Sequence, residues 1–421
     1  MTDPGGLFRH TGFRRLWTAD VLSQFGDRIT VLALPLLAAT TLQASAFQVA
    51  SLRTVQTLAY LVLGLQAGAW CDRIRLRPVL IGTDLGRALA YGSVPIAAAF
   101  GVLTLWQLFA VVAVAGVLAV FFEVGHQTFL PRLIERDRLI EGNARLQANI
   151  SVAAVTAPSA SGFLVQYLGG PFAIGVNAVS FLWSAAWLRG IRDRERVPRP
   201  ETRPPLRTQI REGVRFVFRH PLLRPLAETT ALASLFQSFQ LAVSVLFLLQ
   251  VIHLTPGQIG LVSTTGLLGA MTAALFGRRL AARIGEARAM WLGGVVIAVG
   301  YVLVASTTGG AGIACYPVGN FLASGGITVL NILQVSFQQT VTPEGLRGRV
   351  TATMRFMIFS MAPIGSLLSG VVAATAGMRA SLWIATAGLT LAALRLVFSP
   401  LRRMRTLPDA YVATEPGSRP A

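Results

Sequence analysis

The sequence predicts an all-α integral membrane protein, with twelve transmembrane helices in two six-helix bundles and both termini in the cytoplasm. Hydrophobic segments of about 20 residues, long enough to cross roughly 30 Å of hydrocarbon as a helix, recur along the chain. Arginine is concentrated in every second gap between them, and one long polar stretch divides the chain in two. The composition agrees, because 53% of the residues are hydrophobic and only 13% are charged, against about 25% charged in soluble domains.

The hydrophobic segments give the predicted helices in chain order. Shorter gaps, richer in polar residues, glycine or proline, separate them and mark where each helix ends. The segments are residues 16–41, 48–70, 79–100, 104–125, 147–167, 171–189, 226–250, 257–276, 289–306, 313–336, 352–374 and 380–398.

The arginine distribution gives the predicted orientation. Arginine occurs before residue 16, after residue 399, and in the gaps at 71–78, 126–146, 189–224, 277–288 and 342–350. The alternate gaps, near residues 43, 101, 167, 251, 306 and 374, contain only His253 and Arg379 as basic residues. Basic short loops stay in the cytoplasm, so we expect a multi-pass protein of a bacterial inner (plasma) membrane.

The net charge of +19 comes from arginine alone, because the chain has no lysine. Topology and contact with anionic membrane lipids account for this charge, and we expect no nucleic-acid partner. Cys71 and Cys315 lie far apart, and the four histidines are scattered. Since no metal-ligand cluster, nucleophile elbow or phosphate-binding loop is present, we expect neither a metal or cofactor nor an enzyme.

The longest polar stretch sets the predicted domains. We expect an N-terminal bundle at 1–190, a cytoplasmic linker at 191–221, a C-terminal bundle at 222–400 and a disordered tail at 401–421. Within the linker, Leu206, Ile210, Val214 and Val217 form one helical stripe beside regularly spaced arginines. That pattern is typical of a helix in the membrane interface, although an exposed linker helix fits equally well.

The two parts of the chain resemble each other. QTFLPRLIERDR at 127 matches QTVTPEGLRGR at 339, and APSASG at 157 matches APIGS at 362, with following segments of similar length. Chance similarity between apolar segments is the alternative to duplication. Transporters built from related halves hold their substrate between those halves, near the middle of the bilayer.

Two short motifs resemble those of the major facilitator superfamily. In the gap after 48–70, Gly68, Asp72, Arg73 and Arg77 match that family's loop signature, whereas Trp70, Arg75 and Leu76 do not. Pro158 and Gly162 match its antiporter motif, which has lost two glycines here. The arginine motif of many proton-coupled members is absent from the segment 104–125. FRRLWTADVLSQFGDRITVLALPLL near the N-terminus and PRLIERDRLIEGNARLQ at 131 resemble the branch with macrolide-efflux and enterobactin-export proteins.

The resemblance implies a monomeric secondary active transporter that exports a small amphipathic molecule by proton-coupled alternating access. An importer or an uncoupled facilitator is the alternative, and a non-transporting sensor is a more remote one. It also implies a cytoplasmic gate, in which Asp72 caps a helix that begins near Thr351 and pairs with Arg355. The alternative is that Asp72, Arg73 and Arg77 only fix topology and the turn.

Five acids lie in or beside predicted transmembrane segments, where a charge costs at least a few kcal/mol and therefore indicates pairing or function. They are Asp20, Asp27, Asp84, Glu123 and Glu228. Asp84 and Arg87 are one helical turn apart and fit a structural pair. The secondary candidates for proton coupling are two further acids. Glu123 lies near His126 and Gln127 in the sequence, and Glu228 is its possible counterpart in the second half.

Asp20, Gln24 and Asp27 share one helical face that must avoid lipid. Asp27 lies near the middle of the bilayer and is the first candidate for proton coupling, because burial makes a carboxylate easier to protonate. A static ion pair with Arg28 or Arg53 is the alternative. Asp20 is closer to the cytoplasm, where we expect water to reach it.

Polar and aromatic residues in the later segments are candidates for a substrate cavity. They are Gln237, Gln240, Asn320, Asn331 and Gln334, with Phe236 and Phe239 as an apolar wall and Gln24 from the first segment. Ordinary helix packing is the alternative for each of them.

Overall fold

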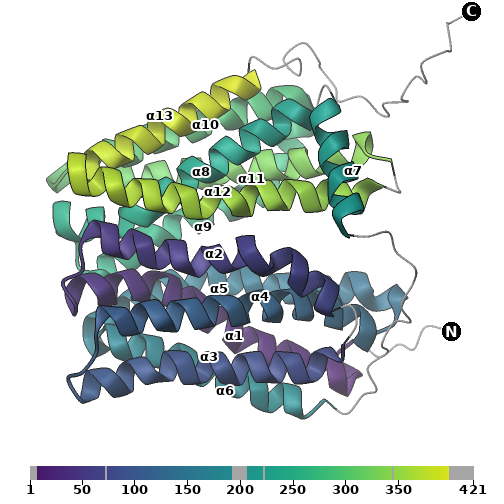
Figure 1. Cartoon of the computed structure of the whole chain (residues 1–421). Helices are drawn as coiled ribbons and strands as arrows, with labels where there is room; N and C mark the ends of the chain where they lie inside the picture. The colour runs from purple at the N-terminus through teal and green to yellow at the C-terminus, as the bar shows by residue number, and fades with distance from the viewer. Residues whose placement is uncertain (1–6, 72–73, 192–205, 221–222, 344–345, 398–421) are drawn as a thin grey trace, which may run out of the picture.

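A computed structural model describes residues 7–71, 74–191, 206–220, 223–343 and 346–397 (Figure 1). Every regular element in these ranges is helical. The first group of helices is α1 (Thr11–Thr40), α2 (Ala46–Cys71), α3 (Leu76–Ala99), α4 (Leu105–Leu133), α5 (Leu139–Leu168) and α6 (Gly170–Arg189). After α7 (Leu206–Arg219), the second group is α8 (Leu223–Leu246), α9 (Pro256–Ile284), α10 (Glu286–Ala305), α11 (Cys315–Val341), α12 (Arg347–Ala376) and α13 (Met378–Val397).

The described ranges also contain short helical turns: η1 (Leu7–Arg9), η2 (Arg136–Arg138), η3 (Phe247–Val251) and η4 (Gly310–Ala314). Each predicted hydrophobic segment coincides with one helix of the two groups. Among the described residues, nine helical stretches are long and apolar enough to cross a membrane, and they involve α1, α4, α5, α6 and α8 to α12. The chain is therefore an all-helical membrane protein.

Local sequence explains several helix ends. The Thr104 hydroxyl accepts a hydrogen bond from the Gln107 amide at the start of α4. Thr255 and Gln258 form a reciprocal capping box at the start of α9, where Pro256 follows the cap. These side chains satisfy amide groups that the first helical turn leaves without a partner.

The last two helices of each group match in length and in the turn that joins them. α5 and α12 both have 30 residues, and α6 and α13 both have 20. The turns between them are made by Gly169 at φ 86° and Gly377 at φ 89°, in the left-handed region that glycine adopts without steric cost. This correspondence supports duplication over chance similarity.

The helices pack mainly within their own group. α1 packs on α5 and α6, and α3 on α4 and α6; α8 packs on α12 and α13, and α11 on α9 and α10. Between the groups, the main contacts join α2 to α12 and α5 to α9, and Figure 1 shows the purple and blue helices on one side of this boundary and the green and yellow ones on the other.

α7 occupies the position of the predicted linker helix and packs on α12. Gly213 fits against this helix so closely that a Cβ there would lie 2.7 Å from both the Arg349 carbonyl oxygen and the Thr353 hydroxyl. Val217 is completely buried, and Glu212 pairs with Arg349. Burial lowers the pKa of His220, which follows α7 and accepts a hydrogen bond from the Leu223 amide.

Candidate functional site

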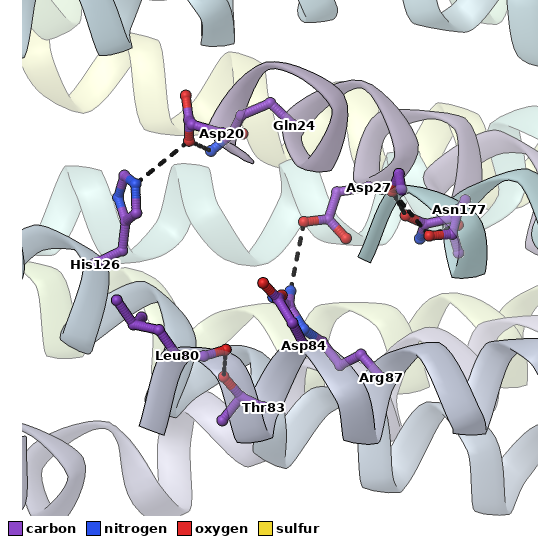
Figure 2. Close-up of polar contacts among 11 residues, drawn as sticks. Asp20, Gln24, Asp27, Leu80, Thr83, Asp84, Arg87, His126 and Asn177 are labelled. Carbon is purple, nitrogen blue, oxygen red and sulfur yellow. Dashed lines mark hydrogen bonds and ion pairs between the residues drawn. The ribbon is translucent and has the colours of Figure 1, made fainter. Parts of the chain in front are cut away.

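Asp20 is the centre of a buried polar cluster that joins α1, α4 and α5. Its carboxylate accepts a hydrogen bond from Gln24 at 3.1 Å, and His126 Nε2 lies 3.5 Å away (Figure 2). It also accepts a hydrogen bond of 2.9 Å from Asn149. Only 2% of Asp20 is exposed. The expectation that water wets Asp20 is therefore wrong for this conformation, because three side chains enclose the carboxylate.

Asp27 belongs to a second charged cluster two turns further along α1. Arg87 lies 3.6 Å from Asp27 and 2.5 Å from Asp84, so one guanidinium joins two carboxylates. The Arg87 guanidinium also lies 4.2 Å from the ring centre of Phe122 and 4.1 Å from that of Phe181. Asp84 is fully buried, whereas 45% of the Asp27 side chain is exposed.

The partner of Asp27 differs from both alternatives considered from the sequence. Arg87 pairs with it, and no ion pair joins Asp27 to Arg28 or Arg53 in the described part of the chain. In the sequence, Arg87 is already accounted for by its pair with Asp84, one helical turn away, so nothing indicated a second partner. Only the tertiary structure, in which α1 and α3 both pack on α6, shows that the same guanidinium reaches a second acid.

The gate motif is only partly described. Asp72 and Arg73 lie outside the described residues, Gly68 is near the end of α2, and Arg355 is exposed on α12. Arg77 donates hydrogen bonds to the carbonyl oxygens of Leu188, at 3.2 Å, and Arg189. These contacts join α3 to α6 within one group, whereas the predicted gate requires contacts between groups.

One residue that the sequence analysis missed supports the loop of this motif. Arg132, buried at the end of α4, donates hydrogen bonds of 2.9 Å to the carbonyl oxygens of Cys71 and Ile74. These oxygens flank the segment that contains Asp72. An arginine after a proline in a basic gap gave no signal that separated it from the other arginines there.

The antiporter-like motif lies where α5 crosses α9. A Cβ added to Gly162 would clash with the Pro256 carbonyl oxygen and lie 3.0 Å from the Gly260 Cα atom. Gly260 in turn faces the carbonyl oxygen of Pro158. The two backbones are therefore in direct contact, which small residues permit in membrane helices.

A cavity of about 280 Å³ lies between the two groups of helices. α1, α2 and α5 contribute one side, and α8, α9 and α11 the other. Of the predicted cavity residues, Gln240 and Asn320 line it, as does Pro158. Arg28 and Arg53 also line it, although the sequence analysis considered them only as partners of Asp27.

Other predicted cavity residues lie elsewhere. Gln334 donates a hydrogen bond of 2.6 Å to Thr230, Phe239 is buried, and Phe236 packs against Gly388. Gln237 and Asn331 are not among the residues that line the cavity. Helical periodicity could not separate these positions, because each helix also faces its own group.

The two secondary acids have different surroundings. Glu228 pairs with Arg224 and Arg395, each at 3.0 Å, in a partly exposed cluster that joins α8 to α13. Glu123 is exposed beside Tyr60. His126, expected beside Glu123, instead faces Asp20. No group of three or more His, Cys, Asp or Glu in the described ranges is arranged to hold a metal ion.

Two groups of membrane helices, a cavity between them and charged clusters inside one group define a transporter of the major facilitator type rather than an enzyme. Comparison with known proteins agrees. The chain belongs to the MFS_3 family, described as transmembrane secretion effectors, whose profile matches residues 4–415.

Similar proteins include efflux transporters. The multidrug efflux pump Tap of Mycolicibacterium fortuitum is 30% identical, over 91% of this chain and 93% of the pump. The enterobactin exporter EntS of Salmonella choleraesuis is 26% identical over 66% of each chain.

Solved structures share the fold. A bacterial homologue of the iron transporter ferroportin in its inward-facing state has a TM-score of 0.72 at 19% identity, covering 93% of this chain and 99% of that one. The corresponding outward-facing structure, with the same identity and coverage, has a TM-score of 0.61.

Proposed function

We propose that this transporter exports a small amphipathic molecule by proton-coupled alternating access. The observation that carries the proposal is the cavity of about 280 Å³, to which both groups of helices contribute. A site at such a boundary becomes accessible from either side when one group rocks against the other. The efflux relatives support export as its direction.

The proposed topology has twelve crossings in two halves, with both termini and the arginine-rich gaps in the cytoplasm. On that topology the contacts between the halves are closest near the outer face. Gly162 meets Gly260 there, and a Cβ on Gly370 would lie 2.8 Å from the Ala50 Cβ. The higher similarity to an inward-facing structure than to an outward-facing one supports a conformation closed to the outside.

The proposed coupling site is the cluster of Asp27, Asp84 and Arg87. If both carboxylates are ionised, one guanidinium faces two acids and the cluster carries one net negative charge. A net charge inside a membrane protein is costly, and protonation of one acid removes it. Asp27 is the acid we expect to take up the proton, because its side chain is accessible while Asp84 stays paired and buried.

The test uses inverted membrane vesicles with an imposed inside-acid pH gradient, and two probes, the anion naphthalene-2-sulfonate and the cation ethidium. The wild type should accumulate at least one of the two probes inside the vesicles while protons leave them. Asp27→Asn should lose the dependence on the gradient, because an amide cannot carry a proton. Glu141→Gln is the matched control, since Glu141 pairs with Arg145 on its own helix, outside the cluster.

The outcomes separate the alternatives. Entry of a probe only to equilibrium, at a rate independent of the pH gradient, indicates an uncoupled facilitator. Gradient-driven loss of preloaded probe indicates an importer. Full pH-driven accumulation by Asp27→Asn would show that another group couples the proton.

A further inference from the structure

Two arginines line the central cavity, and no carboxylate lines it with them. Arg28 extends from α1 and Arg53 from α2, and no Asp or Glu is among the residues that line this space. Neither arginine makes an ion pair with an acid of the described ranges. Asp27, the acid nearest to Arg28 in the sequence, pairs with Arg87 instead.

Arg53 is the more unusual of the two. Its side chain is partly buried, and its Nε atom is inaccessible and has no hydrogen-bond partner in the described part of the chain. A guanidinium has five N–H donors and no acceptor. An unpaired charge in such a place costs several kcal/mol, unless a counterion or water compensates it.

Several other polar groups of the cavity already have partners. Gln240 donates a hydrogen bond of 2.6 Å to the Ser244 hydroxyl, and Ser244 donates to the Gln240 carbonyl oxygen at 2.8 Å. Asn320 donates to the Ser263 carbonyl oxygen at 3.3 Å. The two guanidinium groups are therefore the strongest donors left for a bound molecule.

Apolar side chains form the remaining walls. They include Val31, Leu34, Val49, Leu52, Leu241 and Leu267. The volume is near the lower end of the roughly 300–1,000 Å³ that small-molecule sites occupy. Such walls favour an apolar body on the ligand, and they disfavour an inorganic anion that keeps its hydration shell.

We propose that the cavity binds an amphipathic organic anion, with its acidic group between Arg28 and Arg53 and its apolar body against the leucine and valine walls. This inference rests on the proposed function only in taking the cavity as the site of the transported molecule. A guanidinium binds a carboxylate, sulfonate or phosphate through paired, charge-assisted hydrogen bonds. A cation would meet two like charges in the same place and be excluded.

The test measures equilibrium binding to the purified full-length protein in neutral-lipid nanodiscs. The probes share one ring system and differ in charge: naphthalene-2-sulfonate, naphthalene-2-sulfonamide and 2-naphthylmethylammonium. The wild type should bind the sulfonate about tenfold more tightly than the neutral sulfonamide, because hydrogen bonds between a guanidinium and an anion are stronger than those to a neutral group. The ammonium probe should bind most weakly.

Variants assign the effect to Arg53. Arg53→Gln should reduce the preference for the sulfonate to about twofold or less, and Arg53→Lys should retain part of it, because lysine keeps the charge. Arg283→Gln, which removes an exposed arginine at the end of α9, should leave the preference unchanged. Unchanged binding of the sulfonamide by Arg53→Gln shows that the cavity is still folded.

A wild type that binds the sulfonamide or the ammonium probe as tightly as the sulfonate overturns the inference, as does a full preference in Arg53→Gln. Either result leaves the pH-driven transport of the proposed function untouched. Conversely, a clear preference for the sulfonate together with transport that ignores the pH gradient would overturn the proposed coupling and leave this inference standing.

Discussion

Each acid along one face of α1 has its own set of partners, although Asp20 and Asp27 are only two turns apart. Asp20 is buried and surrounded by Gln24, Asn149 and His126. Asp27 is accessible and shares Arg87 with Asp84. These surroundings favour different roles for the two acids. The hydrogen bond from Asn149 to Asp20 joins α1 to α5, whereas an accessible carboxylate can exchange a proton, as we propose for Asp27.

Removal of a donor to Asp20 should destabilise the first group of helices. Asn149→Ala leaves a buried carboxylate with one hydrogen bond fewer, which costs about 1–3 kcal/mol. We expect a clear fall in the temperature of thermal unfolding in detergent. Asn143→Ala is the matched control, because the exposed Asn143 bonds only its own helix and such changes stay within about 0.5 kcal/mol. Equal unfolding temperatures for both variants would contradict the role of Asp20 as a structural centre.

At the scale of elements, the crossing of α5 and α9 explains the antiporter-like motif. Its glycine lies where two backbones touch, and the facing helix also has a glycine, Gly260, at the contact. The motif residues Pro158 and Gly162 therefore set how closely the halves approach on the side that has little arginine. A sequence motif on α5 alone could not identify Gly260, because the pairing depends on the crossing point.

A methyl group at this crossing should open the arginine-poor side. Gly162→Ala places a Cβ against the Pro256 carbonyl oxygen, so α5 and α9 must move apart. The measurement is the distance between spin labels on cysteines placed at Tyr167 and His253, in a background with Cys71→Ser and Cys315→Ser. We expect a shift of the distribution to longer distances.

Gly82→Ala serves as the control for this experiment, since a Cβ on Gly82 would have no atom within 4 Å. Its distance distribution should match the parent protein. If Gly162→Ala also matches the parent, the crossing does not control closure.

At the scale of the whole molecule, the arginine alternation in the sequence and the packing of the helices agree on which helix ends lie together. Arginine-rich gaps follow α2, α4 and α9, whereas Gly169 and Gly377 turn the chain at the opposite end. α7, which docks on α12 through Gly213 and Val217, lies at the arginine-rich end. This asymmetry supports the proposed orientation, in which the arginine-rich end meets anionic lipid head groups and the other end has short turns.

The proposed orientation predicts which loops an impermeant maleimide reaches in intact cells. In a background without Cys71 and Cys315, a cysteine at the exposed Thr308, between α10 and α11, should be labelled from outside. A cysteine at the exposed Asp137, between α4 and α5, should be labelled only after permeabilisation. Labelling of both sites, or the reverse pattern, would contradict the proposed orientation.

The sequence by itself determined the helical segments, their grouping and the family. Hydrophobic length and arginine placement are local properties, set by the cost of moving side chains and backbone into lipid. They predicted every long helix, and they placed the majority of the helix ends to within a few residues. They also identified Asp27, Gln240 and Asn320 as residues to examine, because polar groups in apolar segments are rare and costly.

Only the tertiary structure decided how those residues combine. The pairing of Asp27 with Arg87, the enclosure of Asp20 and the placement of Arg28 and Arg53 in one cavity all depend on how helices distant in sequence rotate and cross. Periodicity gives the face of a helix but not the neighbour that the face meets, and in this protein each helix has neighbours within its group and across the boundary. The physical reason is that charge pairing acts over a few ångströms, a distance set by packing rather than by position along the chain.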